Sequence, residues 1–226
     1  KVEAGASIDL RAPESIFDLF DDEEAPLVNI LTADGSSPGD VYLQAGKSIG
    51  TETNFIDVEI WSGEINGIVE EDGFIHSVRD LNIGSDPGFT SIAGNLTFEV
   101  DGQTNVGLLT ARLGTVTIAS QDAVADRRND ALRNIESRNV DLYSTNSTIG
   151  TADNPLDIDT SFGGSLGYVN ADAEQTVHLI ETTGPMQVGI VTSRNDDVTL
   201  ETLDGSILDY YSDIANNVTG ISINLV

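Results

Sequence analysis

The sequence predicts an all-β protein built as a solenoid, in which short parallel strands stack coil upon coil. Three observations predict this fold. Blocks of sequence recur in the same order along the 226 residues, and short segments alternate apolar and polar residues, the pattern of half-buried strands. One interval between repeats is also longer than its counterpart by about the length of a coil. Stacked arrays tolerate the addition of a whole coil, which a globular fold does not.

The repeats fall into two well-matched pairs. SIGTETNFIDVEI (48–60) recurs as TIGTADNPLDIDT (148–160), an offset of 100, and VGLLTARLGTVTI (106–118) recurs as VGIVTSRNDDVTL (188–200), an offset of 188 − 106 = 82. One inserted residue later the offset is 83, which aligns Asp126 with Asp209 and Asp130 with Asp213. A third, partial copy, ESIFDLFDDEEAPLVNI (14–30), resembles GSILDYYSDIANNVTGI (205–221).

The two offsets predict the size of a coil. The stretch between Gly63 and Val106 carries 100 − 82 = 18 more residues than its counterpart, about one solenoid coil of roughly 20 residues. The chain would then contain roughly 11 coils. With a rise of about 4.8 Å per coil, they form a rod on the order of 50 Å long.

Each expected strand is short, rich in β-branched residues and bounded by Gly, Asn, Asp or Pro. In chain order the clearest strands are LTFEV (96–100), VTIAS (116–120), NVDLYS (139–144), LDIDT (156–160), TVHLIE (176–181), DVTLET (197–202) and ISINLV (221–226). Turns are expected at Gly50, Gly150, Gly205, Asn54 and Asn154, residues that accept tight or left-handed conformations. SQDAVADRRNDALRNIE (120–136) has a helical composition, but its aligned segment does not, so strand and loop are favoured there.

The alternation of apolar and polar residues predicts which residues form the core and which way a repeated pair of carboxylates points. The predicted core contains Ile49, Val58, Leu108, Val116, Ile118, Ile149, Ile158, Ile190, Val198, Leu200, Ile207 and Ile223. Asp157 and Asp159 flank Ile158, so both are expected to face solvent, as Asp57 and Glu59 would around Val58. On this interpretation Ile158→Asp is strongly destabilising, and Asp157→Asn changes little.

Composition excludes several classes of function. Cysteine is absent, so disulfides, thiolate metal sites and cysteine nucleophiles are excluded. A net charge of −28 disfavours binding to nucleic acid, and no apolar stretch approaches the roughly 18 residues of a membrane span. The chain opens on KVEAGASIDL, without an initiator Met or signal peptide, and its blocks begin and stop in mid-cycle. We expect a segment of a longer exported repeat protein.

Several of these blocks resemble a known family. DVTLETLDGSILD (197–209), NNVTGISINL (216–225) and STIGTADNPLDIDT (147–160) resemble the β-strand repeats of filamentous-haemagglutinin-type bacterial surface proteins. The resemblance covers most of residues 40–226 and rests on the order of short motifs, whereas residues 1–40 fit as less regular coils. It implies one right-handed parallel β-solenoid, an extracellular location and a role in adhesion or as a stalk. The chain departs from the family in its acidity and in irregular segments such as VADRRNDALRNIES.

Motifs for catalysis are weak. GGSLG (163–167) matches the nucleophile elbow of hydrolases, but no helix follows Ser165, and a glycine-rich turn is favoured. Asp196 and Asp197 are the nearest acid pair for a glycan-cleaving β-helix, without a matching groove signature. We predict no catalytic residue and no enzyme.

Motifs for metal binding are equally weak. His76 and His178 occupy similar strand contexts, so repeated strand positions explain them better than a metal pair. Calcium could bind at DDEE (21–24), at NDD (195–197) or at Asp126 with Asp130, although no EF-hand loop or glycine-aspartate nonapeptide is present. No metal or cofactor site is therefore predicted.

The expected function is a structural or adhesive segment of a giant exported bacterial surface protein. Its expected partners are a cell-surface receptor, a glycan, a neighbouring protomer or flanking coils of the parent chain. Two alternatives stay open: a self-assembling extracellular filament or matrix subunit, and a glycan-binding or glycan-cleaving β-helix.

Overall fold

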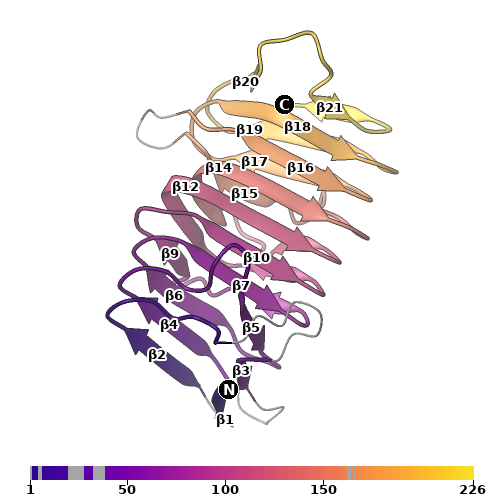
Figure 1. The fold of residues 1–226 in the computed structure, drawn as a ribbon. Helices are drawn as coiled ribbons and strands as arrows, with labels where there is room; N and C mark the ends of the chain where they lie inside the picture. Colours follow the sequence, from indigo (N-terminus) through magenta and orange to yellow (C-terminus); the bar gives the residue numbers. More distant parts are fainter. Residues whose placement is uncertain (1, 5–6, 20–27, 33–38, 162–163, 165) are drawn as a thin grey trace.

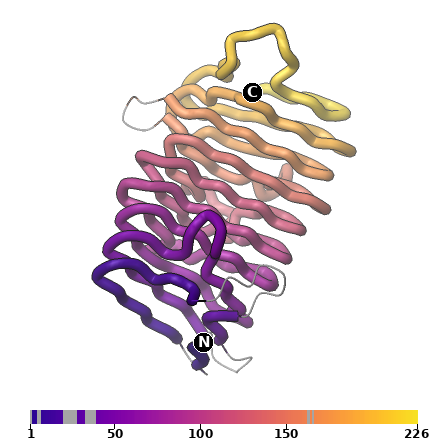
Figure 2. Tube along the Cα trace, viewed as in Figure 1, coloured from indigo at the N-terminus to yellow at the C-terminus, as the bar shows by residue number. Residues whose placement is uncertain are grey.

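The computed structural model describes residues 2–4, 7–19, 28–32, 39–161, 164 and 166–226 (Figure 1). Within these ranges the protein is all-β, and every pairing between two named strands is parallel. The strands stack as a β-solenoid of about 8 turns, roughly 23 residues apart. The chain climbs from the amino-terminal coil at one end of the stack to the carboxy-terminal coil at the other (Figure 2).

Two long ladders and one short one make up the stack. The first ladder contains β1 (Val2–Ala4), β3 (Ile30–Thr32), β5 (Ile56–Glu59), β7 (Gly73–Ser77), β10 (Leu96–Val100), the second halves of β12 (Leu109–Ser120) and β14 (Ile135–Ser144), β16 (Val169–Ala173), β18 (Met186–Ser193), β20 (Ile207–Asp209) and β21 (Val218–Thr219). The second contains β2 (Ile8–Ala12), β4 (Val41–Ala45), β6 (Ile65–Val69), β9 (Phe89–Ser91), the first halves of β12 and β14, β15 (Leu156–Asp159), β17 (Val177–Glu181), β19 (Val198–Thr202) and β22 (Ile223–Leu225). The short ladder contains β8 (Leu81–Asn82), β11 (Thr104–Val106) and β13 (Val124–Asp126).

The coils are longer and fewer than the sequence predicted. Successive residues of one stacked column are 19 residues apart between Val169 and Val188 but 29 apart between Val140 and Val169. The longer interval includes Leu166, Gly167 and Tyr168, which lie outside the named strands. The turns between strands vary in length, so a mean of roughly 23 residues replaces the expected 20.

The core is a continuous apolar column along the axis, because every second residue of each strand points inward. Eight of the expected core residues are buried: Ile49, Val58, Val116, Ile118, Ile149, Ile158, Val198 and Leu200. The assignment of Ile190 was wrong, since its side chain is 54% exposed. The pairing of β16 with β18 shifts register between Val169 and Ala171, and this irregularity reverses the inward phase, so that Val188 and Val191 are buried instead.

Three other core assignments also need correction. Leu108, the counterpart of Ile190 in the aligned block, is only half-buried, and Leu109 takes the core position. Ile207 and Ile223 belong to the last coil, where Ile223 is 48% exposed because no described strand lies above it. The 120–136 segment forms the end of β12, then β13, a loop and the start of β14, and it contains no helix.

Successive repeats face different sides of the stack. Val106 lies on β11 of the short ladder, whereas its aligned counterpart Val188 lies on β18 of the first ladder. Likewise Ile49 stacks between Ile16 and Gly73, while Ile149 stacks between Val124 and Val177. An offset of 82 residues is not a whole number of turns of roughly 23 residues, so each copy is rotated about the axis relative to the one before.

Candidate functional site

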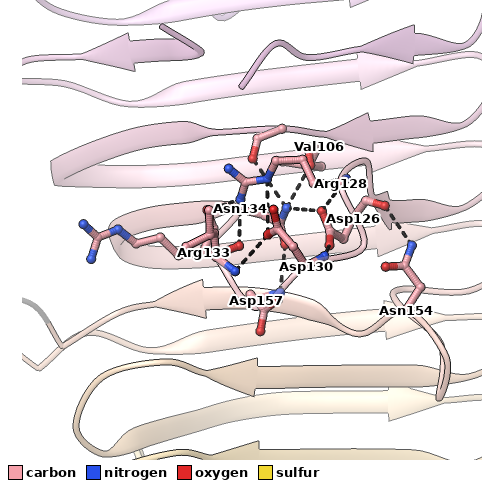
Figure 3. Close-up of polar contacts among 10 residues, drawn as sticks. Val106, Asp126, Arg128, Asp130, Arg133, Asn134, Asn154 and Asp157 are labelled. Atoms are coloured by element: carbon pink, nitrogen blue, oxygen red, sulfur yellow. Dashed lines mark hydrogen bonds and ion pairs between the residues drawn. The ribbon is translucent and has the colours of Figure 1, made fainter. Parts of the chain in front are cut away.

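A network of polar residues, with Asp126 and Asn134 buried, lies in the loop 126–134, here called the Asp–Asn loop, which joins β13 to β14 (Figure 3). Asp126 organises the loop. One of its carboxylate oxygens accepts hydrogen bonds from the Arg128 N–H (2.9 Å) and from Nδ2 of Asn134 (2.6 Å), and the other accepts from the Asp130 N–H (3.1 Å). Asp130 in turn accepts from the Leu132 N–H at 2.9 Å. Short polar side chains that bond to nearby backbone N–H groups shape such loops.

Asn134 closes the loop and joins three successive coils, an arrangement we call the Asn clamp. Its Nδ2 donates to the Val106 carbonyl at 2.9 Å in the coil below. Its Oδ1 accepts from the Asp157 N–H at 3.0 Å, and its own N–H donates to the Asp157 carbonyl at 2.8 Å, both in the coil above. The side chain is fully buried. A buried amide with all these bonds formed adds specific register to an otherwise apolar stack.

The carboxy-terminal loop 209–217 repeats this geometry at the offset of 83. Asp209 accepts from the Tyr211 N–H (2.8 Å), from Nδ2 of Asn217 (3.0 Å) and from the Asp213 N–H (3.2 Å). Nδ2 of Asn217 also donates to the carbonyls of Val188 (3.3 Å) and Gly189 (2.7 Å). The backbone conformation of the two loops also repeats. Asn129 and Ser212, at the same offset, have positive φ angles of 49° and 52°.

A third copy lies near the amino terminus. Asn29 exchanges two hydrogen bonds with Asp57: the Asp57 N–H donates to Asn29 Oδ1 at 2.8 Å, and the Asn29 N–H donates to the Asp57 carbonyl at 2.9 Å. Asn54 Nδ2 donates to the Asp18 carbonyl (3.4 Å), as Asn154 Nδ2 donates to that of Asp126 (2.7 Å). The full clamp therefore occurs at Asn134, its upper half at Asn29 and its lower half at Asn217.

The repeated Ile-Gly-Thr corner belongs to the coil that lies on Asn29 and to the coil that lies on Asn134. Gly50 and Gly150 have φ angles of 66° and 62°, a left-handed conformation that favours glycine. The N–H of each donates at 2.8 Å to the carbonyl of the residue beneath, Ile16 and Val124 respectively. The glycine turns predicted from the repeat are confirmed at both positions.

The expectation that Asp157 and Asp159 face solvent was wrong. Both are buried, with 2% and 1% of their surface exposed, because the Asp–Asn loop covers the outer face of β15. Asp159 pairs with the Arg133 guanidinium at 3.1 Å. Its neighbour Glu136, also buried, pairs with Arg112 at 2.8 Å. Alternation correctly places the carboxylates away from Ile158 but cannot show that another coil covers them.

The two aligned aspartates have different partners. His76 stands beside Asp57 in the pairing of β5 with β7, and its Nδ1 lies 2.6 Å from the Asp57 carboxylate, which raises the pKa of His76. Ile180 occupies the same place beside Asp157. Burial, together with the negative charges of Asp126 and Asp130, raises the pKa of Asp157 to about 6. The residue on the next coil, His76 or Ile180, therefore decides whether an imidazole stands beside the aspartate.

Glu181 is a fully buried carboxylic acid at a position that apolar side chains occupy in lower coils. It stacks above Ile158 and below Thr202. Its two oxygens accept from the Thr160 N–H at 2.8 Å and the Thr160 hydroxyl at 2.6 Å. Burial raises its pKa to about 8, despite these hydrogen bonds, and the Asp159 charge adds to the effect.

The calcium candidates among the described residues are held in hydrogen bonds within the protein. The DDEE segment lies outside the described residues. Asp126 and Asp130 direct their oxygens to backbone N–H groups of their own loop, and Asp197 accepts from the Ser222 N–H at 3.0 Å. No group of three or more His, Asp or Glu side chains that could hold a metal ion occurs within the described ranges.

Among the described residues the catalytic candidates do not converge. Ser165 lies outside the described residues. His76 on β7 and His178 on β17 lie in equivalent strands but at different register positions, since the His178 N–H donates to the Ile149 carbonyl where the Phe74 N–H donates to that of Ile49. Asp196 accepts from the Thr176 hydroxyl at 2.8 Å and from the Asp197 N–H at 2.9 Å, so the acid pair stabilises a turn.

A cavity of about 410 Å³ opens beside the Asp–Asn loop. Its lining includes Leu108, Arg128, Arg133, Thr182 and Thr183. Both arginines are occupied: Arg128 donates to the Leu132 and Arg133 carbonyls at 2.7 Å, and Arg133 pairs with Asp159. Chemically, this arrangement fastens coils together.

No protein-family model, curated protein or solved structure matches the chain. Among the described residues no helix is long and apolar enough to cross a membrane. Sequence reasoning missed Asn29, Asn134, Asn217 and Glu181. The clamps had a usable signal, because an Asn follows each aligned Asp-x-x-x-Asp pair at a fixed distance, eight residues after Asp126 and after Asp209.

Proposed function

We propose that the chain is a structural and adhesive segment of an exported bacterial surface protein and carries no catalytic activity. The observation that supports this proposal most directly is the Asn clamp. Its buried polar groups bond to the backbones of the coils below and above, so these groups hold the stack together instead of facing a substrate. The resemblance of the coil motifs to surface-protein repeats supports the exported location.

The role follows from the mechanics of the stack. Parallel strands in register provide hydrogen bonds along the axis, and the continuous apolar core resists bending between coils. With about 8 turns and a rise of about 4.8 Å per turn, the segment spans about 40 Å. The outer surface, with most of the −28 charge, would meet solvent or a partner. A rigid acidic rod is suited to holding an adhesive surface away from a cell.

Surface labelling tests the proposal. Fab fragments raised against the folded chain should bind intact cells of the native source and should reduce attachment of those cells to host glycans or cell layers. Fab against a cytoplasmic protein serves as the control for cell integrity. Labelling that appears only after permeabilisation would contradict the exported role, and labelling without any effect on attachment would contradict the adhesive role.

The filament alternative makes a different prediction. Strands at both ends pair on one side only, β1 with β3 at one end and β22 with β19 at the other. If folded copies stack end to end, sedimentation velocity should show species that grow with protein concentration. A single monomeric species up to high concentration would eliminate this alternative.

A further inference from the structure

The carboxy-terminal coil presents an open face with a defined pattern of polar groups. In the described structure β20 and β21 pair only with β18, and β22 pairs only with β19. The loop between β20 and β21 stands beyond the last coil (Figure 1). Inward-pointing residues are buried in the lower coils. Their counterparts in this coil are half-buried or exposed: Ile207, Val218, Ile223 and Leu225.

The Asn clamp in this coil has only its lower half formed. Nδ2 of Asn217 makes the same contacts as Nδ2 of Asn134, to two carbonyls below and to the loop aspartate. In the other two copies the clamp Oδ1 accepts an aspartate N–H from the coil above, and the clamp N–H donates to that aspartate's carbonyl. No residue in the described part of the chain makes either bond with Asn217.

The backbone N–H and carbonyl of Ile207 form a second set of groups on the open face of the carboxy-terminal coil. Val124, the counterpart of Ile207, donates its N–H to the Thr148 carbonyl at 2.9 Å and accepts from the Gly150 N–H at 2.8 Å. Ile16 makes the same two bonds, to the Ser48 carbonyl at 3.0 Å and from the Gly50 N–H at 2.8 Å. In both of these copies the partner is the Ile-Gly-Thr corner, and β20 has no described partner on that side.

We infer that this face is a docking site for a β-coil segment of the type Ile-Gly-Thr-x-x-Asn-x-aliphatic-Asp, laid parallel on β20. Each element of the pattern has a recognised atom. The Gly N–H bonds to the Ile207 carbonyl, the Asn amide bonds to the Asp209 carbonyl, and the Asp N–H bonds to Oδ1 of Asn217. The inference deepens the proposed structural role, because it specifies which coil extends the stack, and it rests on that role but not on adhesion.

A second folded copy of the chain does not fit this occupant. The two segments that carry the pattern are internal, and each already pairs on both sides, Ile49 with Ile16 and Gly73, and Ile149 with Val124 and Val177. The amino-terminal strands β1 and β2, which end the stack at the other side, do not carry the pattern. The occupant is therefore a free strand or coil of this sequence type.

Peptide binding tests the inference. A fluorescent peptide with the sequence of residues 147–160 should bind the intact 226-residue chain saturably and with 1:1 stoichiometry, measured by fluorescence anisotropy. A scrambled peptide should not bind. N-methylation of the amide at the position of Asp157, or replacement of the residue at Asn154 by Ala, should each weaken binding roughly three- to tenfold, because each removes one hydrogen bond. These peptide variants leave the protein itself unchanged.

Protein variants provide the complementary arm. Asn217→Ala should weaken binding of the unmodified peptide, while Ile214→Ser at the exposed tip of the same loop should leave it unchanged. Circular dichroism of both variants checks that the solenoid is retained.

Three results would overturn the inference: no saturable binding, binding that is indifferent to the N-methyl group, or self-association of the chain through this face in the absence of peptide. Failure of the surface-labelling experiment would remove the adhesive role without changing the peptide result, so the two proposals fail separately.

Discussion

Glu181 provides the sharpest test of how the stack handles buried charge. The proposed perturbation is Glu181→Gln, which removes the ionisable group and keeps its size. In the folded protein the pKa of Glu181 is raised from 4.5 to about 8 by burial. Between these values the folded chain retains a proton that the unfolded chain releases, so stability falls as the pH rises through this window. Below about pH 4.5 the stabilising effect of the protonated form is complete.

The magnitude follows from the width of the window. Each pKa unit corresponds to about 1.4 kcal/mol, so ionisation of Glu181 lowers the free energy of unfolding by up to about 5 kcal/mol above pH 8. The glutamine variant avoids this loss. At pH 5, where the parent has a neutral carboxylic acid, the variant should match the parent to within about 1 kcal/mol, because the amide is also neutral and its oxygen can still accept from the Thr160 N–H.

Urea unfolding at pH 5.0, 6.5 and 8.5, followed by far-UV circular dichroism, measures these differences. The parent should lose stability with rising pH, and Glu181→Gln should become the more stable protein at pH 8.5. Glu99→Gln, on the exposed side of β10, is the matched control and should change little at any pH. If Glu181→Gln and the parent show the same pH dependence, the argument from burial is wrong.

Three further predictions concern the neighbouring coils. Asp157→Asn should stabilise the protein above pH 6, by at most about 3 kcal/mol, because it removes a buried charge beside two other carboxylates; equal or lower urea midpoints at pH 8 would contradict this. Ile180→His should place a cation beside Asp157, as His76 stands beside Asp57, and NMR titration should then show a lower pKa for Asp157. Asn134→Ala should cost about 2–4 kcal/mol, since it leaves buried backbone groups in two coils unpaired, and faster amide exchange at Asp157 should accompany the loss.

Part of the candidate site is readable from the sequence. The repeat offset of 83 aligns Asp126 with Asp209, and the two loops that these aspartates begin share their hydrogen bonds. The role of Asn134 in joining coils cannot be predicted from the sequence in the same way. The hydrogen bonds of Asn134 reach residues 28 positions earlier and 23 positions later, and local patterning contains no record of which distant backbone groups meet.

The sequence by itself determined the class of fold and the local turns. Alternation with period two specifies strands with one inward face, repetition in fixed order specifies stacking, and Gly50 and Gly150 specify left-handed corners. Only the tertiary structure decided the burial of Asp157, Asp159 and Glu181, and the exposure of Ile190. The physical reason is that burial in a solenoid depends on the coils above and below. The length of each turn sets which residues those coils contribute, and a single register shift exchanges the inward and outward faces.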